Sequence, residues 1–84
     1  MQELIHEYSF VYRGDDGTPY VLRAWGDSRH DGTWEGWLEF KPADGTGRDL
    51  RTGRETTQPN RDAVAYWASG LEPIYFEGAF ARAS

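Results

Sequence analysis

The chain has 84 residues, 38% of them hydrophobic and 15% aromatic, so it can bury one modest core and is expected to form a single domain over residues 1–84. A formal net charge of −5 argues against nucleic-acid binding and against docking on an anionic membrane surface. The chain contains no cysteine, which excludes disulfides and cysteine-ligated zinc, and its two widely separated histidines do not suggest a metal site. No metal and no cofactor is therefore expected.

The sequence also predicts where the protein works. No apolar run approaches the ~18–20 residues that a membrane span needs. Residues 1–10 lack the basic and then apolar order of a signal peptide. Arginine outnumbers lysine by eight to one, a bias typical of GC-rich bacterial genomes and their phages. We therefore expect a cytoplasmic protein of bacterial or phage origin.

Three segments alternate apolar and polar residues with the period of two that is typical of half-buried strands. They cover residues 3–12, 19–27 and 33–41, and loops rich in Asp and Gly separate them, which indicates hairpins. The positions predicted to face inward are, in chain order, Leu4, His6, Tyr8, Phe10 and Tyr12, then Tyr20, Leu22 and Ala24, then Trp34, Gly36, Leu38 and Phe40.

One register satisfies both faces of this antiparallel meander. Facing residue numbers sum to 32 between the first and second strands, and to 62 between the second and third. Arg23 then lies opposite Glu39, while apolar residues meet apolar residues. The other expected pairs are Tyr12 with Tyr20, Val11 with Val21, Phe10 with Leu22, Leu22 with Phe40, Ala24 with Leu38, and Trp25 with Trp37.

The rest of the chain consists of one ambiguous segment and two segments that favour helices. Residues 47–58 are weakly apolar and fit an edge strand or an ordered loop. Residues 59–69 then show the i, i+3, i+4 spacing of an amphipathic helix, with Pro59 in its first turn and Gly70 as a left-handed stop. Residues 73–83 fit a second short helix or a closing strand, and the helix is favoured.

The expected fold is therefore α+β: an antiparallel meander of three or four strands packed on one helix (59–69), with a short C-terminal helix or strand. Its predicted core consists of Leu4, Tyr8, Phe10, Leu22, Trp34, Leu38, Phe40, Val64, Trp67, Leu71 and Phe80.

Two candidate sites follow from this arrangement. The outer face of the sheet is more apolar than a solvated face requires, with the Trp25–Trp37 pair at its centre and charged residues at its rim, as in a protein-binding surface. The full set is Trp25, Trp37, Val21, Val11, Arg23 and Glu39. Coverage of this face by the fourth strand, by the C-terminal segment or by a long Arg side chain is the alternative.

The second candidate is an anion site at the start of the predicted helix, where free N–H groups and guanidinium groups attract anions. Its residues are Arg51, Arg54, Thr56 and Thr57. The alternative is a solvated edge whose arginines pair with the acidic hairpins.

No motif or cluster of residues predicts catalysis, so an enzyme is not expected. The favoured function is a protein-interaction module, such as a small acidic bacterial or phage regulator or inhibitor, that binds another protein or a second copy of itself through the outer face. The alternative is a binder of a small anionic ligand, such as a nucleotide or sugar phosphate.

Overall fold

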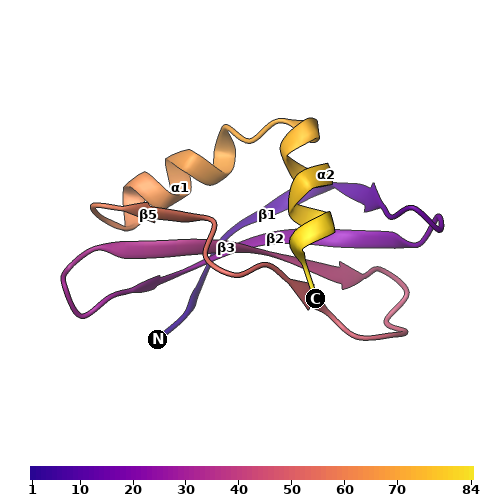
Figure 1. Ribbon diagram of the computed structural model, residues 1–84, viewed down its shortest axis with the longest axis horizontal. Coiled ribbons are helices and arrows are strands. Elements are labelled where there is room, and N and C mark those ends of the chain that lie inside the picture. Colours follow the sequence, from indigo (N-terminus) through magenta and orange to yellow (C-terminus); the bar gives the residue numbers. More distant parts are fainter.

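The computed structural model describes residues 1–84 and has an antiparallel sheet with two helices on one face, which confirms the predicted α+β class (Figure 1). The elements in chain order are β1 (Glu3–Arg13), β2 (Pro19–Ser28), β3 (Trp34–Pro42), β4 (Leu50–Arg51), β5 (Thr56–Gln58), α1 (Arg61–Ser69) and α2 (Pro73–Arg82). The strand order is β1-β2-β3-β4, and β5 also pairs with β3. Residues 47–58 thus supply two short strands.

The predicted register between β2 and β3 is confirmed along the whole hairpin. Leu22 pairs with Phe40 and Trp25 with Trp37, as do all other pairs whose numbers sum to 62. Apolar side chains therefore share the helix-facing side of both strands. Charged residues and the Trp25–Trp37 pair share the opposite side.

The register between β1 and β2 is confirmed only near the hairpin loop, where Tyr12 pairs with Tyr20. Irregularities between Glu7 and Val11 and between Leu4 and His6 then shift the pairing. The predicted pair of Phe10 with Leu22 is not formed.

The second irregularity overturns the prediction that Leu4 lies in the core. Leu4 pairs with Trp25, which places it on the outer face, where its side chain is exposed. Ile5 packs against Gly26 on the helix side instead. An extra residue in one strand reverses the faces of everything beyond it, and strict alternation cannot foresee that.

The core lies between the sheet and both helices. Its buried residues are Leu22, Ala24, Leu38, Phe40, Ala68, Phe76 and Ala79, and Val64 is also fully buried. Of the other predicted core residues, Tyr8, Trp67, Leu71 and Phe80 are half-buried and pack against this cluster. Trp34 is half-buried outside it, and Phe10 is 44% exposed at its rim.

Both predicted helices are present, but their first or last residues differ from the prediction. α1 begins two residues later than expected, because Asn60 is the N-cap and its side chain accepts a hydrogen bond from the Ala63 N–H at 2.9 Å. Gly70 ends this helix with φ −97°, so the predicted left-handed stop is wrong. Residues 73–82 form α2, which starts with a proline in its first turn. Neither helix has the length and the apolar character that crossing a lipid bilayer requires.

The two edges of the sheet differ. At the β4 edge, Ser84 and Arg51 exchange two backbone hydrogen bonds of 3.1 and 3.3 Å, so the C-terminal residues extend the pairing there (Figure 1). β1 is 11 residues long and pairs only with β2. Its outer edge is therefore open, and alternate residues along it leave their N–H and C=O groups without a strand partner.

Candidate functional site

A row of alternating charges crosses the outer face of the sheet, one residue from each of four strands. Facing pairs join Glu7 to Arg23, Arg23 to Glu39, and Glu39 to Arg51. Arg23 contacts Glu7 at 2.8 Å and Glu39 at 3.7 Å. The Arg23–Glu39 pair is thus confirmed, and it belongs to a row with no net charge.

Two residues of this row, Glu39 and Arg51, contact the tryptophan pair. The Trp25 indole N–H donates to the Glu39 carboxylate at 3.2 Å, and the Arg51 guanidinium lies 4.8 Å from the centre of the Trp37 ring. Trp37 is only 6% exposed. The expectation that an open outer face presents Trp37 is wrong, because β4 places a long Arg side chain over the ring, as the alternative interpretation held.

The apolar surface that stays exposed on this face belongs to β1. Val11 is 52% exposed, whereas its partner Val21 is half-buried. Leu4, exposed beside Trp25, lies on the same strand. The exposed apolar residues of the outer face thus gather along the open edge rather than at the sheet centre.

The four residues of the predicted anion site do not converge. Thr57 pairs with Glu35 on the outer face, whereas Thr56 packs against Gly36 on the helix side. Arg51 covers Trp37, and Arg54 is exposed without an ion pair. The start of α1 is already capped by Asn60. These residues do not form one pocket.

A buried carboxylate that the sequence did not single out joins the β4–β5 segment to α2. The Glu55 side chain is 7% exposed and accepts hydrogen bonds from the Tyr75 hydroxyl at 2.5 Å and from Arg82 at 2.6 and 3.1 Å. Burial acts to raise the pKa of Glu55, but the bonds from Arg82 and Tyr75 outweigh it and lower the pKa. Burial and the bond to Glu55 raise the pKa of Tyr75 to about 12. The cluster holds α2 in place.

Replacing Glu55 with Gln should reduce the free energy of unfolding at neutral pH by about 1–2 kcal/mol, because charge-assisted hydrogen bonds are lost while the exposed Arg82 is screened by water. Since folding lowers the pKa of Glu55, its ionised form stabilises the protein above pH 4.5 and that contribution disappears as pH falls below this value. Urea titrations at pH 7 and pH 3 should therefore show a difference that shrinks at pH 3. Glu72→Gln, which removes an exposed carboxylate without a capping bond, is the matched control.

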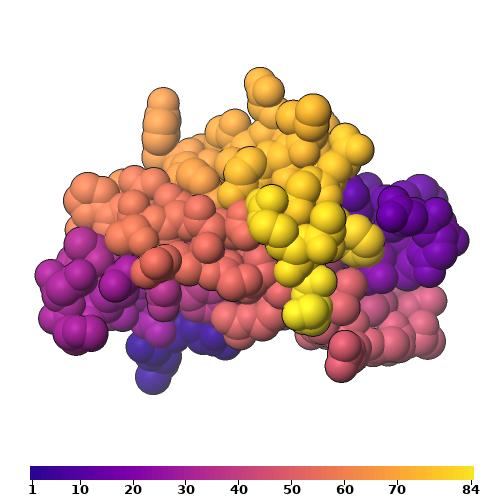
Figure 2. Space-filling model, viewed as in Figure 1, coloured from indigo at the N-terminus to yellow at the C-terminus, as the bar shows by residue number.

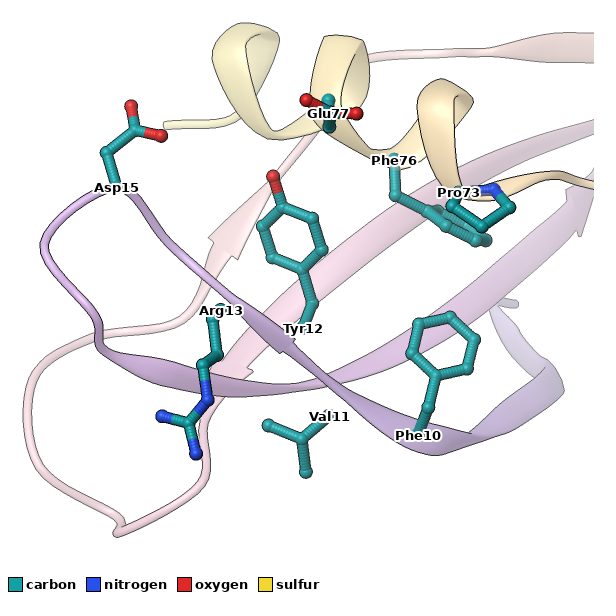
Figure 3. Close-up of a pocket in the computed structure, with 8 residues that line it drawn as sticks. All are labelled: Phe10, Val11, Tyr12, Arg13, Asp15, Pro73, Phe76 and Glu77. Carbon is teal, nitrogen blue, oxygen red and sulfur yellow. The ribbon is translucent and has the colours of Figure 1, made fainter.

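The main hollow of the molecule lies between β1 and α2. It has a volume of about 450 Å³, within the range of ligand pockets. Figure 2 shows α2 (yellow) beside the end of the β1–β2 hairpin (violet), which forms one end of the molecule. Its lining residues, drawn in Figure 3, are Phe10, Val11, Tyr12, Arg13, Asp15, Pro73, Phe76 and Glu77. We refer to this hollow as the β1–α2 groove.

The groove lies along the open edge of β1. Four consecutive β1 residues, 10–13, line it, although successive side chains of a strand point to opposite faces. Figure 3 shows Tyr12 pointing toward α2 while Val11 and Arg13 point away from it. A hollow that contacts both faces of one strand must lie at its edge. Val11, Tyr12 and Arg13 are paired with β2 along their other edge, so the groove lies at the open one.

The walls of the groove are aromatic, and its two acidic residues are Asp15 in the hairpin loop and Glu77 on α2. The Phe10 and Phe76 ring centroids are 5.6 Å apart. Neither Asp15 nor Glu77 takes part in an ion pair, whereas Arg13 donates to the Gly17 carbonyl at 3.2 Å. Burial and then the carboxylates of Glu77 and Asp15 raise the pKa of Tyr12 above its ordinary value.

Sequence reasoning missed this groove because it did not foresee the position of Phe10. Regular alternation places Phe10 in the core, and the irregularity that moves it to the rim leaves no mark in the sequence. A usable signal was present, because the first strand of a meander lies at a sheet edge unless a later strand covers it.

No group of three or more His, Asp or Glu side chains is placed to hold a metal ion. Comparison of the chain with protein-family models, with curated proteins and with solved structures finds no significant match.

Proposed function

We propose that this protein is a non-enzymatic protein-interaction module that binds an extended segment of another protein along the open edge of β1. The observation that carries the proposal is the coincidence of three features on one strand: an unpaired edge, exposed apolar side chains and an adjoining groove. Backbone groups of an open edge bind a further strand, and pockets beside the edge select its side chains.

This proposal moves the binding surface away from the sheet centre. Of the residues predicted for the outer face, Val11 is the one that lines the groove. Four others make contacts within the outer face and with Arg51, and so belong to the structure of the sheet: Trp25, Trp37, Arg23 and Glu39. A small-anion binder is not favoured, because its four candidate residues do not converge.

The interaction role also fits the expected cellular setting, a small acidic regulator or inhibitor in a bacterial cytoplasm. Such proteins act by binding to the surface of a partner protein rather than by catalysing a reaction. A second copy of the chain is the alternative partner, since an open edge can also pair with itself.

Binding of short extended peptides tests the proposal. Three labelled heptapeptides alternate valine with lysine, with glutamate or with threonine, and each is compared with a version N-methylated at alternate residues along its backbone. We expect at least one peptide to bind by fluorescence anisotropy and its N-methylated version to lose binding, because strand addition requires peptide N–H groups. If N-methylation never matters, or if no peptide binds and the chain stays monomeric in sedimentation, the open edge is not a binding site.

A further inference from the structure

Resting on the proposed function, we propose that the partner segment is basic: an extended strand in which lysine or arginine alternates with apolar residues. Its cationic side chains face α2 and lie between Asp15 and Glu77, and its apolar side chains face the opposite side, along Val11.

The alternation follows from the geometry of the edge. A strand added beside β1 points successive side chains to the two faces of the sheet. On the α2 side it meets the rings of Tyr12 and Phe76 and the carboxylate of Glu77 (Figure 3). On the other side it meets Val11 and the stem of Arg13. The α2 side of the groove is therefore aromatic and acidic, whereas the other side carries the apolar Val11 and the side chain of Arg13.

The charges of the groove favour a cation on the α2 side. Seven of the 14 acidic residues are in ion pairs, among them Glu7 with Arg23 and Glu55 with Arg82, and Asp15 and Glu77 are two of the seven that are not. Arg13 does not neutralise them, because it bonds to the hairpin carbonyl of Gly17 and points away from α2. A lysine or arginine placed there gains two carboxylates and lies near aromatic rings, which attract cations through their faces.

The charge of the whole molecule supports the same partner. A net charge of −5 attracts a basic segment over distances of several ångströms and repels a second copy of the chain. The volume of about 450 Å³ accommodates the side chains that one added strand would place beside α2. A basic segment is therefore favoured over self-pairing.

The peptide panel with a charge-neutralised protein tests this inference. We expect the valine–lysine peptide to bind at least about tenfold more tightly than the threonine peptide at low salt, the glutamate peptide to bind least, and the preference to weaken as salt rises. Asp15→Asn with Glu77→Gln should reduce affinity for the lysine peptide about five- to tenfold and leave the threonine peptide unchanged. The control, Glu35→Gln with Asp62→Asn, removes the same charge away from the groove and should have a smaller effect. Circular dichroism and thermal melting verify that both double variants fold.

The outcomes separate this inference from the function on which it rests. Equal binding of the three peptides, lost on N-methylation, would overturn the basic partner while the strand-binding function stands. An equal loss of affinity in both double variants would also overturn it, because net charge alone would then explain the preference. Dimerisation through β1 in sedimentation would identify a second copy as the partner and overturn the inference. Absence of any N-methylation-sensitive binding in a monomeric chain would overturn both.

Discussion

Replacing Phe76 with alanine should lower the free energy of unfolding by about 3–5 kcal/mol, a large share of the ~5–15 kcal/mol typical of a small domain. Phe76 is fully buried on α2, and its ring centroid lies 5.1 Å from that of Tyr8 and 5.6 Å from that of Phe10. Truncation removes these contacts and leaves a cavity under the helix. Urea denaturation followed by circular dichroism measures the loss.

Ile74→Ala provides the control on the same helix. Ile74 is 74% exposed, so its truncation should change stability by no more than about 0.5 kcal/mol. Comparable stabilities of the two variants would contradict the packing of α2 on β1, and with it the wall of the β1–α2 groove.

Replacing Trp37 with serine should cost a similar amount, about 3–5 kcal/mol, although this residue lies on the face of the sheet away from the helices. Its indole is 6% exposed, because Trp25 lies beside it and Arg51 lies over its ring. Serine would leave that space unfilled and remove the surface on which the guanidinium stacks. Chemical denaturation at constant pH measures the difference from the parent.

Leu4→Ser is the comparison for the outer face. Leu4 lies opposite Trp25 but is exposed, and its replacement should cost about 1 kcal/mol or less. If Trp37→Ser is as mild as Leu4→Ser, the outer face is open in solution and Trp37 is available to a partner.

The parts of the fold that follow from local patterns were predictable. Alternation and charge pairing determine the β2–β3 hairpin, since a one-residue slip would bring Arg23 opposite an apolar residue and reverse the faces. The spacing of Val64, Trp67 and Ala68 likewise predicts α1. In these segments, each residue's own environment is set by near neighbours in sequence or by one hairpin partner.

The candidate site was less predictable, because it depends on contacts between distant segments. The irregularities in β1 move Leu4 to the outer face and Phe10 to the rim, and no local pattern marks them. The cover over Trp37 comes from Arg51, fourteen positions later, in a segment (47–58) that fits either an edge strand or an ordered loop by sequence alone. The groove likewise exists only because α2 returns over β1.

The open edge of β1 is the central feature, and mapping of peptide binding by amide chemical shifts tests it most directly. On titration with the valine–lysine peptide, the largest changes should fall on residues 10–15 of the hairpin and on residues 73–77 of α2, the two walls of the groove. Changes centred instead on Trp25 and Trp37, or no saturable change at any residue, would contradict strand addition at β1.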